Sequence, residues 1–342
     1  MNYKLPAEWE PQDAIMMAWP HRGTDWHYML SEAQACFKAV ARAIVSEMRL
    51  IVIAPDADDV KHQLSDIDHN DRILYQEIDT NDTWARDFGP ISVTGNGKQL
   101  MLDFKFNAWG LKFAACLDNL ICAKMQESAI FNTQAINCQD FVLEGGSIES
   151  DGNGTILTTS QCLLSPNRNR HLSKPQIEAM LMKRLGAKKV LWLDSGELTG
   201  DDTDAHIDTL ARLAPGNTIL HVKCNDPSDE QHASLSRMEQ ELKAMTNAQG
   251  TPFNLVPLPC PAPIHDTEGN RLPATYANFL ITNTQVLVPI YNQPQNDNAA
   301  LKTIARAFPD RHVVGIDCNA LIQQHGSLHC ITMQIPKNFL KK

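Results

Sequence analysis

A module of two strands joined by a tight turn, a helix and a third strand recurs along this chain of 342 residues. The two clearest copies run over 154–194 and 278–317, with helices expected at 174–185 and 297–308. A unit of this kind buries its apolar faces against its neighbours, so the repeat constrains the architecture of the whole chain. The polar residues that align in the two copies are Thr158 with Thr282, Gln161 with Gln285, and Asp194 with Asp317.

The same interval separates three polar residues that follow third strands of the module. His206 lies 62 residues after Glu144, and Cys330 lies 124 residues, twice that interval, after His206. A weaker copy with a helix at about 113–126 and a further frame over 218–256 fit this spacing. With the first helix and strands as a fifth unit, modules of about 62 residues account for the chain.

Repeated modules can close around an axis, as in a propeller, and closure removes exposed sheet edges. The sequence therefore predicts an α/β fold, a five-bladed pseudo-symmetric propeller in which Glu144, His206 and Cys330 converge near the axis. No linker or low-complexity segment interrupts the pattern, so residues 1–342 are expected to form a single domain. Chance similarity of short strand–helix units is the alternative, and the two clear copies argue against it.

The composition narrows the class of protein. A formal net charge of -10 argues against nucleic acid or an anionic membrane surface as the main partner. Nine scattered cysteines without a CxxC motif argue against a disulfide framework or a Cys-type zinc site and favour a reducing compartment. The N-terminus lacks a signal-peptide pattern, and no run of 18 apolar residues occurs, so we expect a cytoplasmic protein with no membrane contact. A homodimer is expected only on general frequency.

A candidate nucleophile lies near the C-terminus, in the stretch 326–336. Its side chains alternate as in a short strand, with Cys330 close to one end. A thiolate is the strongest nucleophile that a protein side chain offers at neutral pH. The alternative is that Cys330 is a small buried apolar residue.

Three polar stretches accompany Cys330. The first, 81–90, carries Asp82, Arg86 and Asp87; the second, 141–147, carries Glu144; the third, 200–208, carries His206 and Asp208. If the third stretch is extended, His206 and Asp208 lie on one face because they are two residues apart. Each stretch could instead be an ordinary turn, and a carboxylate-rich loop with a histidine could bind a metal ion.

The residue types together indicate covalent catalysis on a cation. A thiolate and a histidine form a nucleophile and acid/base pair. Several carboxylates beside the nucleophile would repel the oxyanion that develops on an ordinary acyl substrate. They suit a guanidinium, whose planar fork of donors pairs with carboxylates on two sides and leaves the central carbon open to sulfur.

Six segments, spread over nearly the whole chain, carry a family resemblance. They are PAEWEP (6–11), MAWP (17–20), WARDFGP (84–90), EGGS (144–147), TDAHID (203–208) and GSLHCIT (326–332). As a set they resemble the agmatine deiminase and bacterial peptidylarginine deiminase family of guanidine-modifying enzymes. The resemblance implies the five-bladed α/β propeller called a pentein, and catalysis without a metal or organic cofactor.

The resemblance also implies roles for individual residues. Cys330 attacks the guanidinium carbon and forms an S-alkylthiouronium intermediate, and His206 protonates the departing ammonia and then activates water. Asp87 and Asp208 bind the guanidinium nitrogens, Glu144 orients His206 or adds to these contacts, and Trp84 contributes to substrate binding. Ala205 and His325 depart from the family pattern, because glycine is expected at both positions.

The function implied is hydrolysis of agmatine to N-carbamoylputrescine and ammonia, on the route to putrescine. Deimination of peptidylarginine or free arginine is the alternative, and it requires a partner for the substrate carboxylate. Arg86, Arg168 and Arg170 are candidates for that partner. A third hypothesis is a non-catalytic propeller that binds a cationic ligand without converting it to a product.

Overall fold

The computed structural model describes residues 3–68, 71–95 and 97–341. Within these residues the fold is mixed α/β and contains five small sheets, one of four strands and four of three. The three-stranded sheets have the orders β4-β5-β6, β7-β8-β9, β10-β11-β12 and β13-β14-β15. The four-stranded sheet has the order β16-β1-β2-β3, so the last strand pairs with the first.

All five sheets repeat one pairing pattern. The first two strands of each sheet are antiparallel and the third is parallel to the second, and β16, β1 and β2 follow the same pattern. The strands are β1 (Gln12–Ala18), β2 (Arg49–Ala54), β3 (Ile73–Glu77), β4 (Ile91–Gly95), β5 (Lys98–Lys105), β6 (Ala135–Val142), β7 (Ile148–Ser150), β8 (Thr155–Thr159), β9 (Lys189–Leu193), β10 (Ala211–Ala214), β11 (Thr218–Lys223), β12 (Asn254–Pro259), β13 (Leu280–Ile281), β14 (Gln285–Ile290), β15 (His312–Asp317) and β16 (Met333–Pro336).

A helix lies in each connection between the two parallel strands, as parallel pairing requires. These helices are α1 (Leu30–Val45), α5 (Ile121–Glu127), α7 (Lys174–Leu185), α8 (His232–Ala244) and α9 (Pro294–Ala307). The remaining helical segments are α2 (Ala57–Gln63), α3 (Ala85–Phe88), α4 (Ala108–Leu111), α6 (Ser160–Leu163), η1 (Asp25–Met29), η2 (Asp118–Leu120), η3 (Gly145–Ser147), η4 (Ile207–Thr209) and η5 (Leu321–Gln324).

Helix α7 shows why the sequence signals locate these helices well. Ser173 and Gln176 form a capping box at its start, and Gly186 in the left-handed conformation ends it. Ile177, Leu181 and Leu185 recur every four residues and are buried, so one face packs inward. The sequence prediction of a helix at 174–185 is therefore confirmed.

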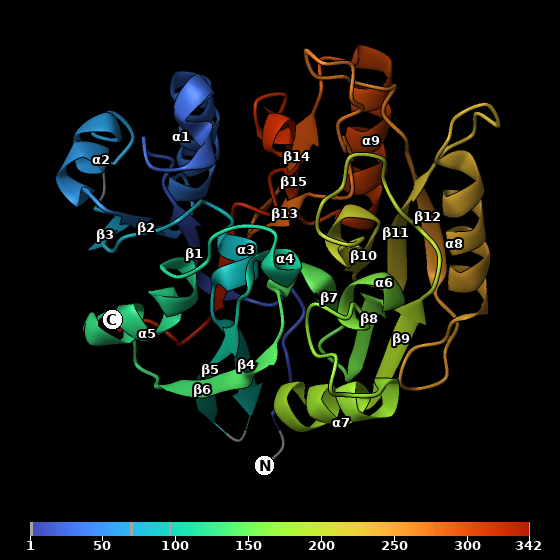
Figure 1. Cartoon of the computed structure of the whole chain (residues 1–342), viewed down its shortest axis with the longest axis horizontal. Helices are drawn as coiled ribbons and strands as arrows, with labels where there is room; N and C mark the ends of the chain where they lie inside the picture. Colours follow the sequence, from blue (N-terminus) through green and yellow to red (C-terminus); the bar gives the residue numbers. More distant parts are fainter. Residues whose placement is uncertain (1–2, 69–70, 96, 342) are drawn as a thin grey trace.

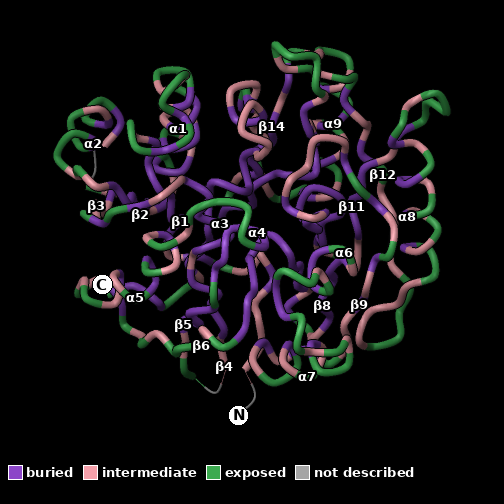
Figure 2. Tube along the Cα trace, in the orientation of Figure 1, coloured by how far each residue is buried: buried purple, intermediate pink, exposed green. Residues whose placement is uncertain are grey.

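The sheets lie around a common centre, with α1, α7, α8 and α9 toward the outside (Figure 1). Buried residues gather toward this centre, and exposed residues line the outer helices and loops (Figure 2). No helix within residues 3–68, 71–95 and 97–341 is long and apolar enough to span a membrane.

Two local predictions are wrong, and one condition, an extended conformation at 206–208, is not met. Cys330 lies in a turn that precedes β16, rather than in an alternating strand, and the residues on both sides of it are buried without alternation. The turn is closed by Thr332, whose N–H and hydroxyl both donate to the carbonyl of His329. His206 precedes the short helix η4, so 206–208 is not extended. The helix expected at 113–126 begins only at Ile121, after the short helix η2.

Candidate active site

The polar residues singled out in the sequence lie at equivalent places in the fold, each a few residues before the first strand of a sheet. They are Asp87 before β4, Glu144 before β7, His206 and Asp208 before β10, and Cys330 before β16; Asn278 holds the same place before β13. Three of them meet at Gly146. A methyl group on Gly146 would lie 2.7 Å from His206 Nδ1, 2.8 Å from Asp87 Oδ1 and 3.1 Å from Asp208 Oδ2. Glycine is needed here because these side chains occupy the space of a larger residue.

Cys330 opens onto a cavity of about 190 Å³. Its side chain is 5% exposed, and its Sγ and backbone N–H both lie 3.3 Å from Asn278 Oδ1. Burial raises the pKa of the Cys330 thiol well above its usual value, and the carboxylates of Asp208 and Asp87 act in the same direction. Burial and these carboxylates therefore favour the protonated thiol over the thiolate.

Most of the other residues that line this cavity are acidic or aromatic. No lysine or arginine belongs to its lining, within the part of the chain that the structure describes. Such a lining favours a cationic, partly apolar ligand. The lining residues are Asp25, Asp82, Trp84, Asp87, Trp109, Phe113, Asp202, Thr203, Gln324, His325, Gly326 and Cys330.

Two hydrogen bonds fix the carboxylate of Asp87 at the inner end of the cavity. The backbone N–H of Gly146 donates to Oδ1 and the indole N–H of Trp109 donates to Oδ2, both at 3.0 Å. Burial raises the pKa of Asp87 to about 6; His206 and Trp109 act against this, whereas Asp208 and Glu144 add to it. Asp87 is therefore largely ionised at neutral pH.

Asp208 is fully buried and has one engaged oxygen. His329 Nδ1 lies 2.7 Å from Oδ2, and Oδ1 has no hydrogen-bond partner among the described residues. Burial opposes ionisation of Asp208, but His329, His206 and Arg212 outweigh it and lower its pKa below the usual value. The site thus contains an ionised carboxylate with one oxygen that has no hydrogen-bond partner among the described residues. Unlike Asp87, neither Asp208 nor His206 nor Glu144 is among the side chains that line the cavity.

His206 lies between these groups and is 1% exposed. Its Nδ1 is 3.6 Å from Asp87 Oδ1, and neither ring nitrogen has a hydrogen-bond partner in the described parts of the chain. Burial alone would lower the pKa of His206, but Asp87, Cys162 and Glu144 raise it well above its usual value. The neighbouring carboxylates of Asp87 and Glu144 therefore favour the protonated, imidazolium form of the ring.

Glu144 is paired with an arginine. Arg168 Nε lies 2.9 and 3.1 Å from the two carboxylate oxygens, and both side chains are fully buried. Donor atoms of Glu144, Cys162 and His206 lie within 4.8 Å of one another, which is the spacing of a metal site. Because Arg168 already engages both oxygens of Glu144, a metal ion there would have to compete with a guanidinium.

The indole N–H of Trp84 donates to Asp82 Oδ2 at 3.0 Å, and its ring forms part of the cavity wall. Gly326 lies against this ring so closely that a methyl group there would be 2.1 Å from Trp84 Cζ3. At two positions the family pattern has glycine where this chain has Ala205 and His325. The backbone φ angles of these two residues are positive, 61° and 63°. The two departures from the family pattern thus fall where the backbone favours glycine.

The arginines considered as partners for a substrate carboxylate do not line this cavity. Arg168 also contacts Asp204 and the carbonyl of Thr203. Arg86 is buried and pairs with Glu8, facing away from the cavity that contains Cys330. Arg170 is exposed and does not border the cavity.

Sequence reasoning missed Trp109, Asn278 and His329. Trp109 lies in a left-handed turn, with φ of 50°, 54°, 91° and 70° at 108–111, which no sequence period indicates. The Asn107 side chain stabilises this turn by accepting from the Gly110 N–H at 3.0 Å and donating to the Asn167 carbonyl at 2.9 Å. The only available signal was the Asn-Ala-Trp-Gly sequence, which is typical of turns.

Comparison with known proteins places these residues in a family. The family described as Porphyromonas-type peptidyl-arginine deiminase matches residues 4–336. A Vibrio parahaemolyticus protein provisionally named agmatine deiminase is 36% identical, covering 98% of this chain and 97% of that protein.

Solved structures agree. A Porphyromonas gingivalis protein provisionally named arginine deiminase is 48% identical, with a TM-score of 0.94 over 99% of this chain and 100% of that one. A cysteine-to-serine variant of C. jejuni agmatine deiminase with substrate bound is 40% identical, with a TM-score of 0.92 over 98% of this chain and 97% of that one. Dimethylarginine dimethylaminohydrolase, 13% identical with a TM-score of 0.51 over 95% of this chain and 100% of that one, shares the fold. The chain therefore belongs to the Porphyromonas-type peptidyl-arginine deiminase family.

Proposed function

We propose that the chain is an agmatine deiminase, which hydrolyses agmatine to N-carbamoylputrescine and ammonia. The observation that carries this proposal is the meeting of Asp87, His206 and Asp208 at Gly146, beside the cavity onto which Cys330 opens. Relatives and neighbours named as agmatine deiminases support it over the full length of the chain. The reaction places the chain on a route to putrescine.

Substrate binding brings the guanidinium between the two carboxylates. Asp87 and Asp208 accept from its nitrogens, and the cation then lies beside the thiol of Cys330. A neighbouring positive charge lowers the pKa of a thiol, so binding favours the thiolate that the chemistry needs. The aromatic rings of Trp84 and Trp109 exclude water around the butyl chain.

The first half of the reaction forms the S-alkylthiouronium intermediate. The Cys330 thiolate attacks the guanidinium carbon, and a tetrahedral adduct forms. His206 transfers its proton to one nitrogen, the carbon–nitrogen bond breaks, and ammonia leaves. We assign to Glu144 the orientation of His206, because one of its carboxylate oxygens lies within 4.8 Å of a nitrogen of the ring and Arg168 keeps the carboxylate in place.

The second half restores the enzyme. Neutral His206 takes a proton from water as the water oxygen attacks the carbon bonded to sulfur. The carbon–sulfur bond then breaks, the Cys330 thiolate leaves, and the remaining hydroxyl proton is lost to solvent, so that the product carries a neutral ureido group. Atoms balance as agmatine plus water giving N-carbamoylputrescine plus ammonia, and no metal or organic cofactor takes part.

The lining of the cavity favours agmatine over arginine. Asp25, Asp82 and Asp202 lie in the wall and suit the primary ammonium at the far end of agmatine. The α-carboxylate of arginine would meet these acids without a lysine or arginine in the described lining to pair with it. Arginine remains the second candidate because the P. gingivalis neighbour is provisionally named an arginine deiminase.

The shared strand pattern supports a closed five-bladed propeller built as one domain over 1–342. Pairing of β1 with β16 would close the ring, and Gln12 Nε2 donates to the carbonyl of Ile281 in the neighbouring sheet at 3.0 Å. We also propose a cytoplasmic location and a homodimer, with no nucleic acid partner.

The direct test is ammonia release from agmatine, arginine and a blocked arginyl peptide, with the wild-type protein and the Cys330→Ala variant. The proposal is supported if the wild-type protein releases ammonia mainly from agmatine and the Cys330→Ala variant releases none. Release mainly from arginine or peptide would move the substrate and keep the chemistry. Equal release by the Cys330→Ala variant would contradict the mechanism.

A further inference from the structure

We propose that Glu8 and His329 are positioning residues for guanidinium recognition, which hold Asp208 so that its free oxygen faces the substrate. This inference rests on the proposed function, because it assigns Asp208 to the guanidinium. Neither residue borders the cavity that contains Cys330. They act from behind it.

His329 bridges two carboxylates. Its Nδ1 lies 2.7 Å from Asp208 Oδ2, and its Nε2 lies 2.8 and 3.0 Å from the two oxygens of Glu8. The ring is 1% exposed, so it cannot turn away into water. A buried carboxylate with one oxygen fixed in this way presents the other oxygen in a single direction. That other oxygen, Asp208 Oδ1, is the one without a partner in the described part of the chain.

The bond to Asp208 persists in either protonation state of His329. As an imidazolium the ring donates from both nitrogens, and as a neutral ring with its proton on Nδ1 it still donates to Asp208. In the neutral case Nε2 cannot donate to Glu8 but can accept from Arg212 Nη2, which lies 3.1 Å away and also pairs with Glu8, so that Arg212 then links His329 to Glu8. Burial, Arg212 and Arg86 lower the pKa of His329, whereas Glu8 and Asp208 act in the opposite direction.

Glu8 connects three parts of the site. Besides His329, its carboxylate pairs with Arg86 at 3.0 Å and with Arg212. Arg86 directly precedes Asp87, His329 directly precedes Cys330, and Arg212 lies in β10 just after Asp208. One carboxylate therefore joins the segments that carry both guanidinium-binding residues and the nucleophile.

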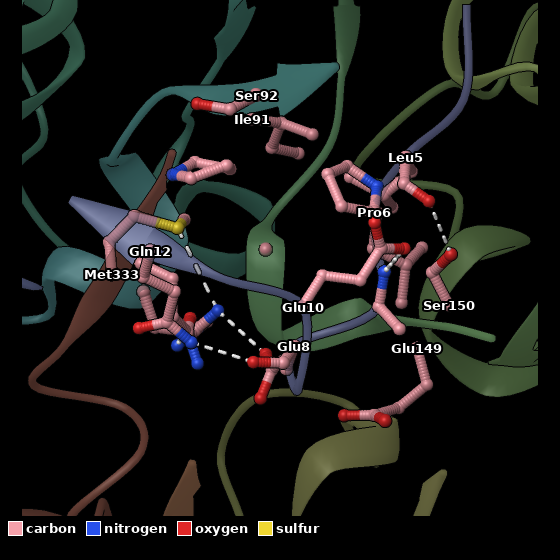
Figure 3. A pocket seen from close by; sticks show the side chains of 16 residues that line it. Leu5, Pro6, Glu8, Glu10, Gln12, Ile91, Ser92, Glu149, Ser150 and Met333 are labelled. Atoms are coloured by element: carbon pink, nitrogen blue, oxygen red, sulfur yellow. Dashed lines mark hydrogen bonds and ion pairs between the residues drawn. The ribbon is translucent and has the colours of Figure 1, made fainter. Parts of the chain in front are cut away.

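Glu8 reaches this position from the N-terminal segment that precedes β1. It lines a second cavity of about 70 Å³, separate from the one beside Cys330, together with Glu10, Gln12 and Glu149 (Figure 3). Burial opposes ionisation of Glu8, but His329, Arg212 and Arg86 outweigh it and lower its pKa well below the usual value. These three side chains therefore favour the ionised form of Glu8.

Glu10 offers a matched control. It lies two residues further on and lines the same second cavity, but it pairs with Lys4 at 2.8 Å and accepts from the Ala7 N–H at 3.1 Å. It has no contact with His329. The change Glu10→Gln therefore removes a carboxylate from the same segment without touching the bridge to Asp208.

The experiment measures agmatine affinity by calorimetry in a Cys330→Ala background, so that turnover does not interfere. Glu8→Gln and His329→Gln are each expected to weaken binding about 10- to 100-fold, the usual cost of a displaced positioning group. Glu10→Gln is expected to bind as the parent does. A thermal unfolding curve of each variant establishes that it is folded at the temperature of the binding measurement. If one of the two test variants is unfolded there, the other still tests the inference.

A pH series separates positioning from a general structural effect. Loss of the His329 ring raises the pKa of Asp208, because that ring lowers it in the parent. His329→Gln should therefore lose more affinity at pH 6 than at pH 8, relative to Glu10→Gln. Equal affinity for agmatine in the parent and both test variants would overturn the inference alone. No binding of agmatine to the parent would overturn the proposed function and this inference with it.

Discussion

Arg168 Nε lies within 3.1 Å of both oxygens of Glu144, and neither side chain is exposed to solvent. The same guanidinium contacts Asp204 and the Thr203 carbonyl, in the loop that leads to His206. A single arginine thus stabilises both the acid beside His206 and the loop that carries His206.

Replacing this arginine should be costly. Arg168→Met leaves the Glu144 carboxylate buried without its partner, and breaking a buried pair in this way costs about 3–5 kcal/mol. We expect a lower free energy of unfolding in urea and loss of agmatine turnover. Arg170→Met removes an exposed arginine two residues away and should change neither; equal behaviour of the two variants would contradict this account.

The hydrogen bond from Trp109 to Asp87 should determine the pH at which kcat/KM for agmatine begins to rise. Its indole N–H lowers the pKa of Asp87, which is about 6, and Asp87 must be ionised to bind a guanidinium. In the wild type, kcat/KM should rise with pH through about 6. In Trp109→Phe the pKa of Asp87 rises, so this limb should move to higher pH. The indole N–H of Trp192 donates to Glu178 instead, so Trp192→Phe should keep the wild-type profile. An unshifted limb in Trp109→Phe would argue against Asp87 as the titrating group.

Asp82 should contribute to recognition of the ammonium end of agmatine. Burial and the nearby Asp25 raise the pKa of Asp82 to about 7, so its negative charge appears as the pH rises through that value. Asp82→Asn is expected to raise KM for agmatine roughly tenfold above pH 8, the worth of one charge-assisted hydrogen bond. Below pH 6 the difference should shrink, because Asp82 is then neutral in the wild type. Asp310→Asn, an exposed change, should leave KM unaltered, and a pH-independent effect of Asp82→Asn would contradict the assignment.

The left-handed backbone at Ala205 predicts a stabilising substitution. Its φ of 61° is unfavourable for a residue with a Cβ, by about 1–2 kcal/mol, and glycine avoids this cost. We expect Ala205→Gly to raise the thermal unfolding midpoint. Ala214→Gly, at the end of strand β10, should lower it, since glycine there only adds conformational freedom to the unfolded chain. A lower midpoint for Ala205→Gly would show that the methyl group packs too well to lose.

The repeat carried most of the information that could be read from the sequence. Glu144, His206 and Cys330 fall at equivalent places because each precedes the first strand of a sheet, and the spacing of the modules records this directly. The conformation around Cys330 could not be read in the same way. Its neighbours are buried on all sides, so polarity does not report which way each side chain points.

The supporting residues were hidden because their partners are distant in sequence. Glu8 and His329 are separated by 321 residues, and no local pattern relates them. Trp109 depends on a left-handed turn that propensity disfavours. The sequence makes Arg168 a candidate partner for a substrate carboxylate, and only its burial against Glu144 shows that it is already engaged.

The proposed mechanism requires a covalent bond between Cys330 and the guanidinium carbon. Mass spectrometry of the protein quenched in acid during turnover of agmatine, followed by peptide mapping, detects this bond. We expect a mass increase equal to agmatine minus ammonia, confined to the peptide that contains Cys330 and absent from the Cys330→Ala variant. Turnover of agmatine with no adduct on Cys330, or with the adduct on another residue such as Cys162, would contradict the mechanism.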